Sequence, residues 1–134
     1  MEKIEKWKFP VSSNCICSGV NLTYQKGDAI LTYDYYDIDN DDKVFNGGLI
    51  FSGTVAHRHS SEKFTKYIEG SYDTLLEITN SDWINELTTL SPDWAKRLSM
   101  KNFAIYLDSY GLFEFIAKDF IVMNIKEGEM EQGA

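Results

Sequence analysis

Residues 103–123 read FAIYLDSYGLFEFIAKDFIVM, and this stretch decides the fold class. Large apolar side chains alternate over residues 103–107, which is the period of a β-strand. Residues 108–111 read DSYG and have the composition of a turn, and an aromatic-rich run from 112 to 123 follows directly. The stretch therefore predicts a hairpin of two β-strands.

The two-residue period extends outward from this hairpin over most of the chain. Four further runs are expected to be strands, namely 14–25, 29–36, 44–59 and 72–78, while 63–67 fits a strand or a loop. In the run 44–59 the core face is predicted to carry Phe45, Leu49, Phe51, Val55 and His57. Asn46-Gly47-Gly48 in the same run indicates a bulge or a close approach of two backbones.

One segment, residues 81–99, has a helical period instead. Ser81 is expected to cap a helix whose apolar side chains recur at helical spacing, and Pro92 is placed to start a second helix. The spacing favours core positions for Trp83 and Trp94. The two helices are expected to cover one end of the sheet or to plug the mouth of a barrel.

Together these elements predict a mainly β protein. The expected fold is an antiparallel β-sandwich or flattened barrel of about seven strands with one short two-helix insert around 81–99. A parallel fold would need helices between successive strands, and only one helical segment is present. The 134 residues fit a single globular domain, 1–134. Residues 1–10 are expected to be a surface arm docked by Trp7 and Phe9, and residues 126–134 a frayed acidic tail.

The charge balance limits the classes of partner. The chain has 21 acidic and 13 basic residues and a net charge of −8. Nucleic acids and anionic membranes are bound largely through Lys and Arg, so both are poor partners, whereas a basic protein fits. The first residues do not resemble a secretory signal, and no run approaches the roughly 18 apolar residues of a membrane span. We expect a cytoplasmic protein with Cys15 and Cys17 as reduced, buried thiols, and a homo-oligomer is left open.

An acidic loop has the spacing of oxygen ligands in a calcium site, at Asp37, Asp39 and Asp41. The pattern is incomplete, because Asp42 stands where the turn needs glycine and Gly48 where a bidentate glutamate is needed. The loop is therefore a candidate calcium site of another kind or a solvated hairpin turn.

His57 and His59 project to one side of the same strand and are candidate metal ligands. A metal site would need a carboxylate from elsewhere in the chain, and the candidates are Glu62, Glu69, Asp73 and Glu77. The alternative is a half-buried His57 with its hydrogen bonds satisfied and an exposed His59 at the end of the strand.

No signature of catalysis is present in the sequence. The chain lacks a G-x-S-x-G nucleophile motif, a Walker-type loop and a G-x-G-x-x-G motif. Close pairs of carboxylates carry no information in a chain with 21 acidic residues. The sequence therefore favours a non-catalytic protein over an enzyme and predicts no cofactor.

Candidate binding residues lie between the end of the run 44–59 and the start of the helical segment. Partly exposed aromatic side chains can anchor a protein partner, which makes Tyr67 and Trp83 candidates, and Arg58 and Glu69 complete the expected rim. The full set is His57, Arg58, His59, Tyr67, Glu69, Asp73 and Trp83.

Four segments carry a resemblance: HRHSSE at 57–62, YIEGSYDTLLE at 67–77, SDW at 81–83 and YLDSYGLFEFIA at 106–117. They resemble a group of small uncharacterised bacterial proteins over residues 45–122. The group has no established activity, so the resemblance implies no catalytic residue. In size and acidity the chain is also similar to bacterial immunity proteins, which implies a partner such as a toxin.

Three hypotheses follow. The first is a non-catalytic protein-binding module with an acidic surface, with the loop 37–42 and the rim around Arg58, Tyr67, Glu69 and Trp83 as contacts. The second is a metal-dependent enzyme or metal-binding domain that uses His57 and His59. The third is a small-molecule binder with a cavity within the sheet.

Overall fold

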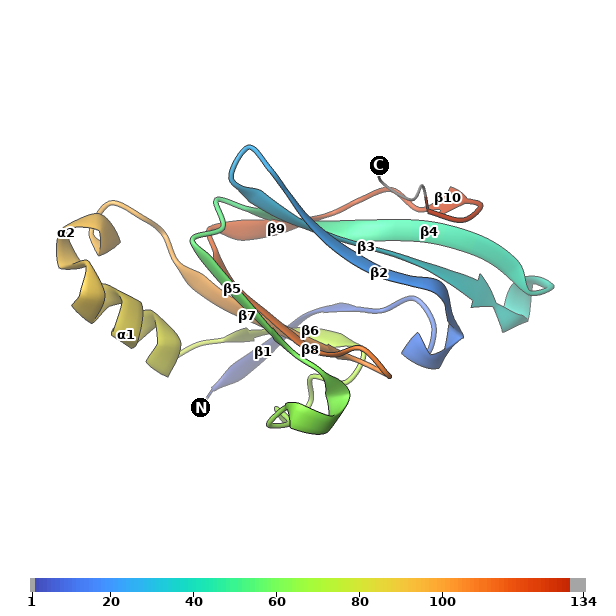
Figure 1. Ribbon diagram of the computed structural model, residues 1–134, viewed down its shortest axis with the longest axis horizontal. Helices are drawn as coiled ribbons and strands as arrows, with labels where there is room; N and C mark the ends of the chain where they lie inside the picture. The colour runs from blue at the N-terminus through green and yellow to red at the C-terminus, as the bar shows by residue number, and fades with distance from the viewer. Residues whose placement is uncertain (1, 131–134) are drawn as a thin grey trace.

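Two antiparallel β-sheets that face each other make up the computed structural model, which describes residues 2–130 (Figure 1). Sheet A has the order β1-β6-β7-β8-β5, formed by β1 (Lys3–Lys8), β6 (Thr74–Ile78), β7 (Lys101–Leu107), β8 (Gly111–Ala117) and β5 (Ala56–Ser60). Sheet B has the order β10-β4-β3-β2, formed by β10 (Lys126–Glu127), β4 (Lys43–Ser52), β3 (Asp28–Asp37) and β2 (Ile16–Gln25), and β9 (Asp119–Val122) also pairs with β4. The arrangement confirms the predicted mainly β sandwich.

The core lies between the two sheets. Its fully buried side chains come from both, namely Leu31, Tyr33, Leu49 and Phe51 of sheet B and Phe103, Ile105 and Phe115 of sheet A. Phe51 and Phe115 stack with ring centroids 4.0 Å apart, and the burial of Leu49 and Phe51 confirms the predicted core face of β4. Val55 and His57, which were predicted on the same core face, are exposed, because the chain leaves sheet B at Gly53. Strand β8 is buried on both faces, because a second apolar cluster that includes Leu112 covers its outer side.

The β2–β3 hairpin forms as predicted. Its two turn residues, Lys26 and Gly27, have φ angles of 52° and 84°, which is the geometry of a tight hairpin turn with the right-handed twist of its strands. A short 3-10 turn, η1 (Ser13–Cys15), precedes β2. Of the two cysteines expected to be buried, Cys15 is buried and Cys17 is exposed, and both are free thiols.

The run predicted as one strand over 44–59 is divided between the two sheets. After β4 the chain turns at Gly53, whose φ is 59°, and continues as β5 in sheet A. Pairing of β4 with β3 is continuous through Gly47 and Gly48. A Cβ on Gly48 would lie 2.8 Å from the carbonyl oxygen of Leu31. Gly48 therefore marks the predicted close approach of backbones, whereas Gly47 lies against the Tyr33 side chain, and the bend occurs at Gly53.

A second passage between the sheets lies beside this one. Only Lys118 separates β8 in sheet A from β9 in sheet B. The Lys118 N–H donates to the carbonyl oxygen of Ser52 at 2.8 Å, and the Val55 N–H donates to that of Ile116 at 2.9 Å. The two passages are therefore hydrogen-bonded to each other at one corner of the sandwich.

Both predicted helices form, as α1 (Asp82–Leu90) and α2 (Pro92–Ala95). Ser81 caps α1 as expected, since its hydroxyl accepts a hydrogen bond from the Ile84 N–H at 3.1 Å. The helices project from one end of the sandwich (Figure 1), and neither contains a fully buried residue. Trp83 is half-buried, whereas Trp94, expected in the core, is 62% exposed. The apolar side of α2 therefore faces away from the core.

The ends of the chain are more regular than expected. Residues 3–8, predicted as a surface arm, form β1 at an edge of sheet A, and Phe9 is buried in the core. At the other end Met130 is buried, and its N–H donates to the buried carboxylate of Asp34 at 3.2 Å. The predicted tail is thus held against sheet B as far as Met130, while 131–134 lie outside the described residues.

Candidate binding cleft

The outer face of sheet A contains a cleft with a volume of about 540 Å³, which we call the sheet A cleft. Its floor consists of buried residues on strands of the sheet, Ile78, Asn102, Leu112 and Glu114. Its sides come from the start of α1, with Trp83, and from the loop that follows β5, with Lys66. The floor residues face outward because their neighbours along β7 and β8, such as Phe103 and Phe115, point into the core.

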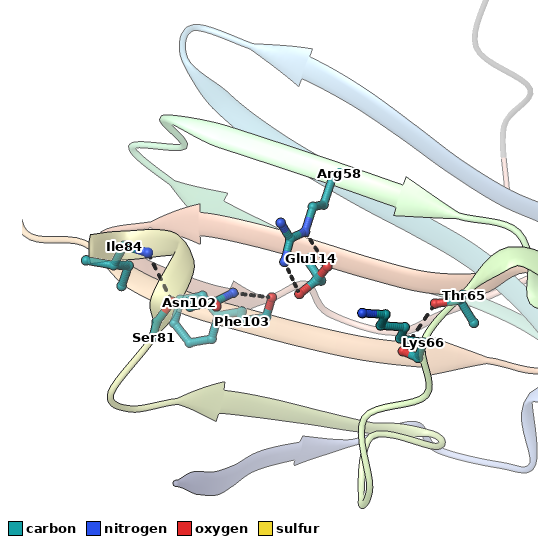
Figure 2. A network of polar contacts seen from close by, with 8 residues as sticks. All are labelled: Arg58, Thr65, Lys66, Ser81, Ile84, Asn102, Phe103 and Glu114. Atoms are coloured by element: carbon teal, nitrogen blue, oxygen red, sulfur yellow. Dashed lines mark hydrogen bonds and ion pairs between the residues drawn. The ribbon is translucent and has the colours of Figure 1, made fainter. Parts of the chain in front are cut away.

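An ion pair lines the sheet A cleft (Figure 2). Arg58 on β5 lies directly opposite Glu114 on β8, so both side chains emerge on the same face. The Arg58 Nε donates to Glu114 Oε2 at 2.5 Å, and its Nη2 donates to Oε1 at 3.2 Å. The Glu114 side chain is 8% exposed and that of Arg58 is 53% exposed. The pair therefore has one buried member and one member open to solvent.

Trp83 holds the other side of the same guanidinium group. The central carbon of that group in Arg58 lies 4.0 Å from the centroid of the Trp83 ring, in the geometry of a cation–π contact. The carboxylate of Glu114 and the Trp83 ring thus restrict the guanidinium from two directions. Arg58 is therefore oriented before any ligand arrives, and its side chain lines the sheet A cleft.

A second polar contact fixes the position of α1 and therefore of Trp83. The Ser81 hydroxyl, which caps α1, donates to Asn102 Oδ1 at 2.9 Å, and both residues are buried (Figure 2). The Asn102 side-chain amide donates in turn to the carbonyl oxygen of Phe103 at 3.4 Å. The start of the helix is thereby tied to β7 at the floor of the sheet A cleft.

The loop on the opposite side carries exposed aromatic side chains. After the 3-10 turn η3 (Glu62–Phe64), Phe64 is 87% exposed and Tyr67 is 55% exposed. Tyr67 packs edge-on against Tyr106, with ring centroids 5.7 Å apart. Desolvation, together with the carboxylates of Glu62 and Asp108, raises the pKa of Tyr106.

The structure brings some of the predicted binding residues together and separates others. Arg58 and Trp83 meet in the sheet A cleft, and Tyr67 lies on the adjoining loop. The Glu69 carbonyl oxygen accepts a hydrogen bond from the Lys3 ammonium group at 2.9 Å. Asp73 has a local structural role, because its Oδ2 accepts from the Ser13 N–H at 3.1 Å.

His57 and His59 lie on the opposite face of β5 from Arg58. His57 Nδ1 lies 2.5 Å from the hydroxyl of Tyr24, whose pKa is raised by burial, and His59 Nε2 lies 2.6 Å from the carbonyl oxygen of Tyr110. Between residues 2 and 130, no three His, Cys, Asp or Glu side chains are placed so that they could hold a metal ion. The structure thus brings no carboxylate to the two histidines, and a metal site there stays a prediction.

The acidic loop connects β3 to β4 at the opposite end of the sandwich from the helices (Figure 1). It contains the 3-10 turn η2 (Ile38–Asn40), and the Asp37 side chain accepts a hydrogen bond from the Asp39 N–H at 3.1 Å. Asp41 adopts the left-handed conformation with a φ of 54°. These are features of a hairpin turn, and the loop is remote from the sheet A cleft.

Sequence reasoning did not single out Glu114, Lys66 and Asn102 as site residues. One signal for Glu114 is present, because it shares the outward parity with Leu112 and Ile116 in a strand otherwise composed of apolar residues. A carboxylate in such a strand is rarely buried without a partner. Lys66 and Asn102 have no comparable signal, since their positions depend on a loop conformation and on the docking of α1.

Comparison with protein-family models, with curated proteins and with solved structures finds no match to this chain. Over residues 2–130, every helix is too short or too polar to cross a membrane. The resemblance to small bacterial proteins and to immunity proteins therefore stays a prediction.

Proposed function

We propose that the protein is a non-catalytic binding module that receives part of a protein partner in the sheet A cleft. The observation that supports this proposal is the half-exposed Arg58, held between Glu114 and Trp83 in the wall of the cleft. Arginine, tryptophan and tyrosine are the residue types that most often dominate the free energy of protein–protein binding. An arginine whose orientation is already restricted loses little conformational entropy when it binds.

The exposed rim favours a macromolecular partner over a small ligand. A volume of about 540 Å³ also falls in the range of small-molecule sites. However, Phe64 and Tyr67 extend the apolar surface outward to solvent. Large exposed apolar side chains beside a cleft are typical of protein interaction sites. A net charge of −8 further favours a partner with net positive charge, and a toxin would be one such partner.

Site-specific photocrosslinking in cells tests the proposal. A photoreactive phenylalanine analogue replaces Phe64 at the rim of the sheet A cleft. A matched control places the same analogue at Ile38, which is 66% exposed but lies in the acidic loop at the far end of the sandwich. We expect the Phe64 position to give an adduct of defined mass that the Ile38 position does not give.

A second variant distinguishes an adduct formed with a bound partner from one formed by random collision. Tyr67→Ala changes a half-exposed rim residue that the core does not need, so it is expected to reduce the yield of the Phe64 adduct without changing the melting temperature. No adduct from Phe64, or the same set of adducts from Phe64 and Ile38, would count against the proposal.

A further inference from the structure

Two cations and two carboxylates line the sheet A cleft. The four charged residues are Arg58, Lys66, Asp82 and Glu114. Glu114 is neutralised by Arg58, and Asp82 lies in the first turn of α1, where the positive end of the helix offsets a negative charge. Lys66 forms no salt bridge with any residue between 2 and 130. The cleft therefore contains one cation without a salt-bridge partner among the described residues, in a chain whose net charge is −8.

The two cations line the same cleft. Figure 2 shows the Lys66 side chain extended from its loop toward the Arg58–Glu114 pair. A guanidinium group has five N–H donors, of which Glu114 uses one on Nε and one on Nη2. Three N–H donors of Arg58 remain, and its side chain is 53% exposed. An arginine edge and an ammonium group at one site provide the donors that a carboxylate accepts.

We infer that the sheet A cleft binds a side-chain carboxylate of the partner, which accepts hydrogen bonds from Arg58 and Lys66 while the neighbouring partner residues pack on Trp83 and Phe64. This inference rests on the proposed function and specifies the chemistry of the segment that enters the cleft. Glu114 has the role of a positioning residue, because it fixes the guanidinium but is itself shielded from the ligand.

Local and global charge have different effects on such a partner. A net charge of −8 attracts a basic protein over distances of about one Debye length and raises the rate of encounter. The two cations in the cleft then select the position on that partner where a carboxylate protrudes. A uniformly acidic protein would be repelled by the rest of the surface, so the expected partner combines overall positive charge with one exposed Asp or Glu.

Titrations followed by NMR test the inference on the full chain without a known partner. The probes are N-acetyl-glutamate α-amide and its uncharged counterpart N-acetyl-glutamine α-amide, with inorganic phosphate as a second anion. We expect saturable shifts of the Arg58 Nε–H and Trp83 indole signals with the glutamate probe, at a dissociation constant on the order of millimolar for so small a ligand. The glutamine probe and phosphate are expected to bind at least about tenfold more weakly.

Two exposed lysines of the same loop provide a matched pair of variants. Lys66→Gln is expected to weaken binding of the glutamate probe about three- to fivefold, which is the contribution of one exposed ion pair. Lys63→Gln, at a residue outside the cleft, is expected to leave the affinity for the probe unchanged. Equal shifts with glutamate and glutamine, tighter binding of phosphate, or equal effects of the two variants would overturn the inference. Crosslinking at Phe64 without binding of the glutamate probe would leave the proposed function standing and reject only the carboxylate.

Discussion

Arg58 and Glu114 lie opposite each other on neighbouring strands, and their two hydrogen bonds join an exposed cation to a buried carboxylate. The pair crosses 56 residues of sequence and connects β5, an edge strand of sheet A, to the neighbouring strand β8. Because only the carboxylate is buried, the two partners are not equivalent. Removal of the Arg58 side chain leaves a buried carboxylate without a partner, whereas removal of the Glu114 side chain leaves the arginine in contact with water.

Removal of the cation should therefore cost more stability than removal of both charges. We expect Arg58→Met to lower the free energy of unfolding by about 2 kcal/mol, less than for a fully buried pair because water reaches the site. The double variant Arg58→Met with Glu114→Leu should return to within about 1 kcal/mol of the wild type. Urea denaturation of the single and double variants gives the coupling free energy, and a double variant less stable than Arg58→Met would contradict this account.

The helix cap at Ser81 offers a second prediction with an internal control. Ser81→Ala removes the acceptor of the Ile84 N–H hydrogen bond and leaves the side-chain oxygen of buried Asn102 without its hydroxyl donor. We therefore expect the free energy of unfolding to fall by about 1–2 kcal/mol. Ser91, at the start of α2, makes no capping hydrogen bond through its side chain. Ser91→Ala should therefore change the free energy of unfolding by less than about 0.5 kcal/mol. Thermal and urea denaturation compare the two, and equal losses would count against a specific role for Ser81.

Two glycines with positive φ should differ sharply in their tolerance of a methyl group. Gly111 begins β8 with a φ of 94°, and a Cβ there would lie 2.0 Å from the carbonyl oxygen of Ser60. Gly27 has a φ of 84°, but its Cβ would meet nothing within 4 Å. We expect Gly27→Ala to lower the free energy of unfolding by about 1 kcal/mol, from backbone conformation alone. Gly111→Ala is expected to lower it by about 3 kcal/mol or more. Similar melting temperatures for the two variants would refute the close approach at Gly111.

Alkaline pH should destabilise the protein through its buried tyrosines. Burial raises the pKa of Tyr33 well above its ordinary value, with a smaller effect from Tyr35. The folded protein therefore keeps a proton that the unfolded chain releases above pH about 10. The stabilisation is fully present below that pH, and the free energy of unfolding falls as the pH rises further.

The variant Tyr33→Phe removes this titration and should flatten the fall. Denaturation series at pH values from about 9 to 11 compare its slope with that of the wild type. Parallel slopes in the two proteins would show that Tyr33 does not carry the effect.

The architecture could be predicted because burial in a sheet has a local signature. Alternation of side chains identified the core face of β4, and the turn at Lys26 and Gly27 followed from residues adjacent in sequence. The division of the run 44–59 was not visible, because alternation continues through Gly53 into β5 and says nothing about which sheet a strand joins.

The candidate site could be predicted only in part for the same reason. Arg58 and Trp83 belong to residue types that favour binding surfaces, and both line the sheet A cleft. Glu114 joins them through the pairing of β5 with β8, which is set by contacts distant in sequence. The exposure of Trp94 shows a further limit of prediction from sequence. Helical spacing identifies the apolar side of a helix, but it does not show whether another element covers that side.

The paired passages at Gly53 and Lys118 have a mechanical consequence. Two connections that lie side by side and are joined by the hydrogen bonds of Lys118 and Val55 restrain twisting of one layer against the other at this corner. Since β5 begins and β8 ends at this corner, the strands that carry Arg58 and Glu114 are held together at the same end. A partner that entered the sheet A cleft as proposed would therefore contact two strands whose relative position is fixed by the fold.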